Sequence, residues 1–153
     1  MYLGGEMQVE YKQEFLFLVQ EEVQPLAELE WEESGHPTKE LCIDWHTYTQ
    51  LEDLGKLRFY TARVEGKLIG YFVVLVAAPL TTIEVVGCYD SVYVHPDYRK
   101  SRVFMTLLKF VEKCLKDEGV TSVVASSSEK NPIDKLLSRV GYSPIETKHE
   151  KVL

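Results

Sequence analysis

The chain has 153 residues, a formal charge of −7 at pH 7 and a sequence pI of about 5.1. Hydrophobic residues make up 45% and charged residues 27% of it, so we expect a single globular domain over residues 1–153. The acidic balance argues against broad binding to nucleic acid or to an anionic membrane, and it is compatible with a basic partner such as a polyamine or a lysine side chain.

Three cysteines, at positions 42, 88 and 114, are far apart and form no CxxC or Cys/His pair. This spacing argues against a disulfide framework and against a metal site, and it favours a reducing cytoplasm. No apolar run approaches the ~20 residues that a membrane span needs, and the N-terminus does not resemble a secretion signal. We therefore expect a soluble cytoplasmic protein without a metal ion.

The first third of the chain predicts a short strand followed by two helices. Residues 8–11 fit the strand, and residues 13–33 carry apolar side chains at helical spacing, with a kink or break expected at Pro25. Asp44 can cap a second helix over residues 45–53.

The middle of the chain predicts a β-hairpin. Residues 57–64 and 67–77 flank a Glu65-Gly66 turn, which indicates two antiparallel strands. The second strand is an almost continuous apolar run, which is typical of a central strand covered on both faces.

A further strand is predicted within residues 82–94. Glu84 and Asp90 are the carboxylates of this region. Because side chains alternate along a strand, Asp90 is expected to share a face with Val92 and Val94.

Residues 92–115, VYVHPDYRKSRVFMTLLKFVEKCL, pass from this strand through a turn into an amphipathic helix. Arg99, Lys100 and Arg102 form a basic cluster where the helix begins. The first turn of a helix has N–H groups without intrahelical partners and the positive end of the dipole, so a phosphate is favoured there. The alternative is that the cluster is only a solvated surface turn.

The sequence HPDYRKSRVFMTLL resembles motif A of the GCN5-related N-acetyltransferases (GNAT), whose V-x-P-x-x-R/Q-x-x-G-x-G/A loop and following helix hold the pyrophosphate of acetyl-coenzyme A. Val94, Pro96 and Arg99 match that pattern in register, and Arg102 and Phe104 stand at its two glycine positions. A glycine lets the backbone approach a phosphate closely, so Phe104 is the main departure. It is expected either to point into the core or to fill the pyrophosphate seat.

The C-terminal part predicts a strand at residues 121–126 and a short helix from Asn131 to Val140. The stretch NPIDKLLSRVGYSPIET resembles motif B of the same family, in which a helix ends in Gly-Phe/Tyr before a final strand. Tyr98-Arg99-Lys100 and residues 141–147 resemble, more narrowly, small phage-encoded members, which would place the protein in a host cytoplasm.

The resemblance implies an α/β (α+β) fold with a mixed, mostly antiparallel sheet of six to seven strands flanked by helices. It also implies acetyl-coenzyme A as cosubstrate, with pantetheine lying along the fourth strand. The residues that it assigns to the coenzyme are Val92, Val94, Arg99, Lys100, Ser101, Arg102, Val103, Phe104 and Asn131.

The implied reaction is transfer of an acetyl group to an amine of a small molecule or a protein lysine. Asp90 is the first candidate for the general base and Glu84 the second. A backbone N–H near Tyr93 or Val94 is expected to stabilise the oxyanion. Many family members have a tyrosine that acts as the general acid, and this chain has Leu137 at that position. The groups left open for this role are Tyr93, Tyr98, Tyr142 and water.

The acidic and aromatic residues of the first helices are candidates for the acceptor pocket, because the same fold places such helices on the acceptor side. Glu30, Trp31 and His46 are our candidates, and the alternative for each residue alone is a place in the core or on the surface. The cluster consists of Glu30, Trp31, Glu33, His36, Trp45, His46 and Tyr48. There are two alternatives to the enzyme. One, supported by Phe104 and Leu137, is a catalytically inactive module that binds a protein, such as a phage product acting on a host factor. The other is an acyl-coenzyme A sensor, which retains the ligand without turnover. A homodimer is also compatible with the sequence.

Overall fold

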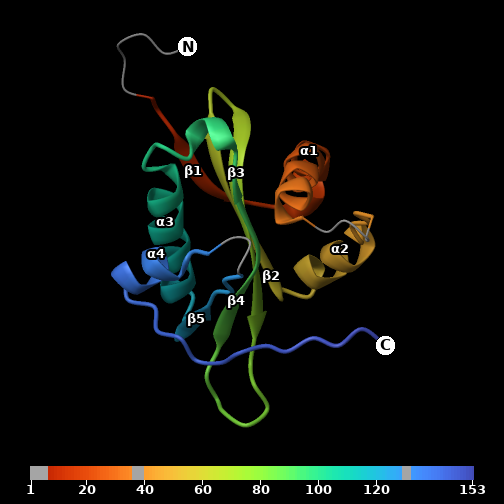
Figure 1. Cartoon of the computed structure of the whole chain (residues 1–153), viewed down its shortest axis with the longest axis vertical. Helices are drawn as coiled ribbons and strands as arrows, with labels where there is room; N and C mark the ends of the chain where they lie inside the picture. The colour runs from red at the N-terminus through yellow and green to blue at the C-terminus, as the bar shows by residue number, and fades with distance from the viewer. Residues whose placement is uncertain (1–6, 36–39, 129–131) are drawn as a thin grey trace.

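The computed structural model describes residues 7–35, 40–128 and 132–153. A five-stranded sheet in the order β1-β2-β3-β4-β5 forms the centre of this part, and helices cover both of its faces (Figure 1). The elements are β1 (Glu10–Glu14), α1 (Leu16–Ser34), α2 (Trp45–Asp53), β2 (Leu57–Val64), β3 (Lys67–Ala77), β4 (Val86–Val94), the 3-10 turn η1 (Pro96–Tyr98), α3 (Val103–Asp117), β5 (Ser122–Val124) and α4 (Asp134–Arg139).

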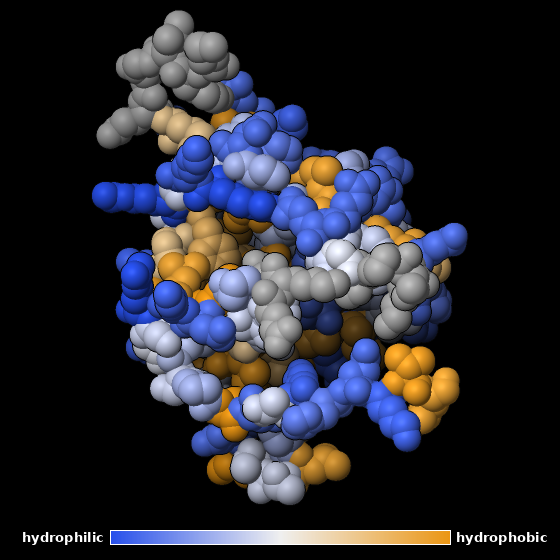
Figure 2. All heavy atoms as spheres, viewed as in Figure 1, coloured by the Kyte–Doolittle hydropathy of each residue, from blue (hydrophilic) through white to orange (hydrophobic). Residues whose placement is uncertain are grey.

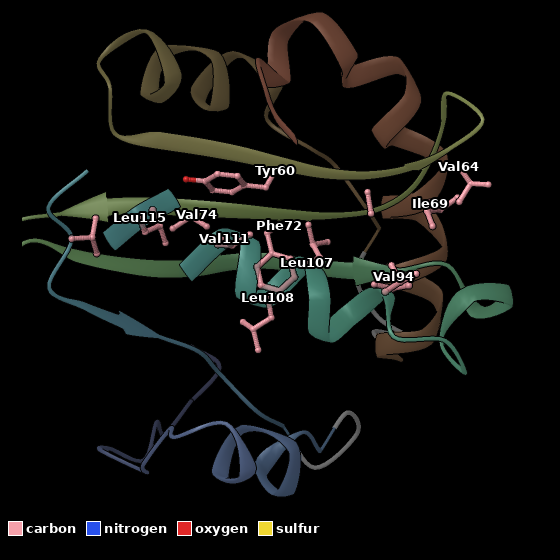
Figure 3. Packing of buried hydrophobic residues seen from close by; sticks show 13 residues of the cluster. Tyr60, Val64, Ile69, Phe72, Val74, Val94, Leu107, Leu108, Val111 and Leu115 are labelled. Carbon is pink, nitrogen blue, oxygen red and sulfur yellow. The ribbon is translucent and has the colours of Figure 1, made fainter. Parts of the chain in front are cut away.

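The sheet separates two hydrophobic layers, one toward α1 and α2 and one toward α3 (Figure 1). Alternating side chains of β3 serve both: Phe72 and Val74 join the α3 layer, whereas Tyr71 and Val73 join the α1 layer. Figure 3 shows the α3 layer from close by. The prediction that β3 is a central strand is confirmed. Each fully buried aliphatic or aromatic side chain contributes roughly 1.5–3 kcal/mol, so these layers fix α1 and α3 against the sheet.

The sheet has five strands in the described part of the chain, so the expectation of six to seven is wrong. The predicted hairpin strands have the expected bounds. Strand β4 pairs antiparallel with β3 on one side and parallel with the short β5 on the other. Residues 143–153 are exposed and pair with no strand. Without hydrogen-bonded neighbours, this segment adds no further strand beyond β5.

Helix α1 is continuous through Pro25, so of the predicted kink or break the break is wrong, and the kink stays a prediction. A proline inside a helix costs roughly 3 kcal/mol. The helix nevertheless buries Leu16, Val19, Val23 and Leu26 against the sheet, and this burial outweighs the cost. The predicted cap of α2 is confirmed.

A buried arginine holds α1 and β1 to β2. Arg63, with only 6% of its surface exposed, donates from Nε to Glu14 at 2.8 Å and from Nη1 to Glu22 at 2.7 Å. Removing one partner would leave a buried charge unpaired, which is costly. The network therefore fixes the first half of α1. The second half of the same helix carries the acceptor-side residues.

The surface carries both polar and apolar side chains. On the face shown in Figure 2, hydrophilic side chains alternate with several apolar areas, and Phe17, Leu18 and Leu80 are among the exposed large apolar residues. None of the helices in residues 7–35, 40–128 and 132–153 is long and apolar enough to cross a membrane.

Candidate active site

Strand β4 carries a bulge at Asp90. Strand β3 pairs with Ser91 and with Tyr89 but skips Asp90. An extra residue in one strand shifts the alternation of its side chains. The expectation that Asp90 shares a face with Val92 and Val94 is therefore wrong: both valines belong to the α3 layer, whereas the Asp90 side chain turns toward α2.

Two carboxylates meet near the bulge, each held by hydroxyl groups. Tyr48 on α2 donates a 2.6 Å hydrogen bond to Oδ2 of Asp90. Glu30 on α1 accepts hydrogen bonds at Oε2 from Tyr71 at 2.8 Å and from Ser91 at 2.9 Å. Three different elements therefore orient the two acidic groups.

Burial raises the pKa of Glu30 above its ordinary value. The hydrogen bonds from Tyr71 and Ser91 oppose this rise, and the neighbouring charges of Asp90 and Glu33 add to it. A carboxylate in this state attracts a cation strongly, because a positive charge would relieve both the desolvation and the repulsion.

A pocket of about 320 Å³ opens between α1, α2 and the sheet, and a second pocket of about 390 Å³ adjoins it. Tyr48 and Asp90 line both. Among the described residues, no lysine or arginine lines either pocket. The first is walled by carboxylates, aromatic rings and apolar side chains: Glu30, Trp31, Trp45, Tyr48, Tyr71 and Asp90 among them. This lining suits a cationic ligand of small size.

The end of α1 is tied to the loop after β4 by Arg99. Its Nη2 donates to both carboxylate oxygens of Glu33, at 2.9 and 2.7 Å, and its Nε donates to the carbonyl of Val94 at 2.8 Å. The guanidinium lies 5.1 Å from the ring centre of Tyr93, whose hydroxyl donates to Glu33 at 2.7 Å. The side chain of Arg99 is thus already engaged on the acceptor side.

Beyond Cys88, strand β4 has a free edge. Strand β5 pairs with residues 86–88 only. The N–H of His95 donates to Ile69 of β3 at 2.8 Å, so by alternation the N–H groups of Val94 and Val92 point away from β3, toward that free edge. The edge can pair with an extended ligand as a further strand would.

The loop that leads into α3 presents several unpaired donors. In the described structure, the backbone N–H groups of Arg102, Phe104 and Met105 have no protein acceptor. The Phe104 ring packs in the α3 layer, 5.9 Å from that of Phe72. Of the two expected positions of Phe104, the structure shows the one in the core, which leaves the amides open to an anion.

Two tyrosines meet where β5 stops pairing with β4. The hydroxyls of Tyr89 and Tyr142 lie 3.0 Å apart, and Tyr142 also donates to Glu112 at 3.3 Å. Burial raises the pKa of Tyr142 to about 12, so its hydroxyl keeps its proton at neutral pH.

The profile of the acetyltransferase (GNAT) family matches residues 18–142 of the chain. The chain belongs to the GNAT family of acetyltransferases. The free edge of β4 and the donors before α3 lie in the segment that resembles motif A of this family. Acetyl-coenzyme A is accordingly the cosubstrate, and transfer of its acetyl group is the reaction. No curated protein sequence matches the chain significantly.

Solved structures of other GNAT proteins share the fold over nearly the whole chain. A ribosomal-protein-alanine N-acetyltransferase from Brucella melitensis biovar Abortus 2308 is 18% identical, with a TM-score of 0.75 over 95% of this chain and 99% of that one. The aminoglycoside N-acetyltransferase AAC(6')-Iy in complex with CoA is 16% identical, with a TM-score of 0.72 over 99% of both chains. An aminoglycoside acetyltransferase from an uncultured soil metagenomic sample, in complex with sisomicin, is 10% identical, with a TM-score of 0.72 over 95% of this chain and 97% of that one.

The structure brings some predicted GNAT site residues together and separates others. Glu30 and Trp31 line the first pocket with Asp90. His46 is exposed on α2 and lines neither pocket, and Glu84 is exposed in the β3–β4 connection. His36 and Asn131 lie outside the described residues. The roles of all these residues stay predictions.

Sequence reasoning included Glu33 and Tyr48 only in the acidic and aromatic cluster of the first helices, and it did not assign Ser91 or Tyr89 to the site. Trp45 and Tyr48 stand three residues apart on one face of α2, which is a local signal for Tyr48. Ser91 and Tyr89 carry no such signal, since their directions depend on the bulge between them.

Proposed function

We propose that this GNAT protein transfers the acetyl group of acetyl-coenzyme A to a primary amine of a cationic acceptor that binds between α1, α2 and β4. The observation that carries the proposal is the place of Asp90. It lines both pockets on the acceptor side, and it stands two residues after the last β4–β5 pair, where the free edge of β4 begins. Acceptor and coenzyme would meet at this residue.

The coenzyme would bind mainly through the backbone. Pantetheine would pair with the free edge of β4 at Val92 and Val94. The pyrophosphate would accept hydrogen bonds from the unpaired N–H groups before α3 and charge from Lys100 and Arg102, which have no ion-pair partner in the described part of the chain.

Asp90 would act as the general base. An ammonium group held by Glu30 and Asp90 loses one proton to Asp90, and the freed nitrogen lone pair attacks the thioester carbonyl. The backbone N–H of Val92 or Val94, on the free edge, would stabilise the oxyanion of the tetrahedral intermediate. After attack the nitrogen gives its second proton to solvent, and the carbon–sulfur bond then breaks, which yields the amide and the coenzyme thiolate.

The pair Tyr89 and Tyr142 would supply the proton for the departing thiolate. Both hydroxyls lie where β4 and β5 part, and Leu137, at the family's usual tyrosine position, is buried. Of the substitutes that the sequence left open, Tyr142 is favoured by its place beside Tyr89 and by its hydrogen bond to Glu112. Tyr93 is already bonded to Glu33 on the opposite face.

The acidic, aromatic pocket favours a small polyamine or an aminosugar over a neutral amine. Acceptors in the solved relatives include an aminoglycoside, which carries several amines. A protein lysine, a homodimer, a cytoplasmic location and a phage source stay predictions from the sequence. The packing of Phe104 in the core removes one argument for an inactive module.

Acetyl transfer from acetyl-coenzyme A to a panel of amines tests the proposal. The panel contains linear polyamines, aminoglycosides and lysine peptides, and the readouts are thiol release and the mass of the acceptor. We expect turnover with a multiply charged amine and its loss, by about 100-fold or more, in Asp90→Asn. Glu40→Gln, an exposed carboxylate that lines neither pocket, is the control. Absence of turnover with every amine, in a protein that binds the coenzyme, would contradict the proposal.

A further inference from the structure

The last two turns of α1 contact β4 through acidic side chains at helical spacing. Glu30 and Glu33 stand three residues apart and so lie on one face of the helix. The first accepts from Ser91 and the second from Tyr93, which are alternate residues of β4. This double contact sets where the end of α1, and with it the wall of the first pocket, lies over the sheet.

Arg99 completes this contact from the coenzyme side. It belongs to the loop between η1 and α3, yet its guanidinium is bound by both oxygens of Glu33 and by the carbonyl of Val94. The Val94 carbonyl lies on the same edge as the Val94 N–H, the free edge of β4. A single side chain therefore joins the coenzyme edge to the acceptor helix.

We propose that Arg99 is a positioning residue, which acts through Glu33 to hold the acceptor wall of α1 in place over β4 and does not bind the pyrophosphate with its own side chain. The inference rests on the proposed function, since it concerns the same site.

The charge-assisted bonds of Arg99 favour this role. One nitrogen, Nη2, donates to both carboxylate oxygens of Glu33, and the adjoining Tyr93 ring adds a cation–π contact. Nε is used by Val94 and Nη2 by Glu33, so a phosphate could reach only the remaining Nη1 without breaking these bonds. Lys100 and Arg102 are exposed and make no ion pair in the described part of the chain, so they are free to meet it.

The test compares Arg99→Met and Glu33→Gln with Lys100→Met in the full-length protein. Acetyl-coenzyme A binding is measured by calorimetry, and KM and kcat are measured for the best amine. We expect the first two variants to raise the acceptor KM by about tenfold and to change the coenzyme Kd less than about threefold. Lys100→Met should instead raise the coenzyme Kd by about tenfold and change the acceptor KM less than about threefold. Arg58→Met, which removes a comparable ion pair to Glu118 outside the pockets, should change neither constant.

The pH profile separates positioning from a general loss of structure. Glu30 is faced by Asp90 from β4, Tyr71 from β3, Tyr48 from α2 and Glu33 from α1. Because the Glu33 charge raises the pKa of Glu30, Glu33→Gln should move the acidic limb of kcat/KM to lower pH. Arg99→Met leaves the negative charge of Glu33 without its cationic partner, so it should move the acidic limb of kcat/KM to higher pH. Shifts in the same direction in both variants would overturn the inference.

If the protein turns over no amine, the calorimetric titration with acetyl-coenzyme A still tests the positioning role of Arg99. Absence of turnover contradicts the proposed function but not this role. Arg99→Met binding acetyl-coenzyme A within about threefold of the parent would still support the positioning role, and a loss of about tenfold or more would show that Arg99 binds phosphate.

Discussion

The hydroxyl of Tyr48 on α2 lies 2.6 Å from Oδ2 of Asp90, a residue that β3 skips in its pairing with β4. The bulge frees Asp90 from the regular alternation of the strand, and Tyr48 then fixes the direction of its carboxylate. Burial and the Asp90 charge raise the pKa of Tyr48, so its hydroxyl remains a donor at neutral pH.

Tyr48→Phe is therefore expected to lower kcat/KM for the amine by about tenfold, or roughly 1.4 kcal/mol, because Asp90 loses its orienting donor. Coenzyme affinity should stay unchanged, since Tyr48 belongs to the acceptor side. Steady-state kinetics and calorimetry give the two quantities. Tyr11→Phe, on β1 and outside both pockets, is the matched control, and equal losses in the two variants would count against the role of Tyr48.

Tyr142→Phe should lower kcat by about tenfold or more, because the departing thiolate loses its proton donor. The pKa of Tyr142 is about 12, so the parent enzyme should show no loss of this donor up to about pH 10. The deficit of the variant should accordingly be constant between neutral pH and pH 10. A deficit that disappears as pH rises within this range would assign the proton to another group.

Phe104→Ala should destabilise the fold without tightening coenzyme binding. The ring is partly buried against the α3 layer, so its removal should cost roughly 1–3 kcal/mol of unfolding free energy, below the range for a fully buried phenylalanine. Urea unfolding and acetyl-coenzyme A calorimetry measure the two effects. A gain in affinity of about tenfold would show that Phe104 blocks the pyrophosphate after all.

Glu30→Gln should stabilise the protein at neutral pH while impairing acetyl transfer. Burial raises the pKa of Glu30 above its ordinary value of 4.5, so its protonated form favours the folded state. This contribution is fully present below pH 4.5 and is lost as pH rises through the folded pKa. The variant should thus have a higher Tm than the parent at about pH 7–8 and an equal Tm at about pH 4.

Glu28→Gln is the control for this comparison, because Glu28 is exposed on the same helix. Thermal melts across the pH range should show no pH-dependent difference between this variant and the parent. A Tm advantage of Glu30→Gln that persists unchanged at low pH would mean that charge is not its cause.

The sequence by itself determined those elements whose signals are local. The hairpin follows from its turn residues, the Asp44 cap from one side chain and one N–H, and α3 from an apolar stripe. Each depends on contacts within a few residues, so composition and spacing suffice to predict it. The family resemblance of the loop at residues 95–104 also lies in consecutive residues.

Only the tertiary structure decided the site. Whether Asp90 faces α2 or α3 depends on a bulge that appears only when β3 and β4 pair. The continuity of α1 through Pro25 depends on burial against the sheet, and the engagement of Arg99 depends on Glu33, which is distant in sequence. Alternation and propensity describe a segment in isolation. These three features are set by partners that folding brings together.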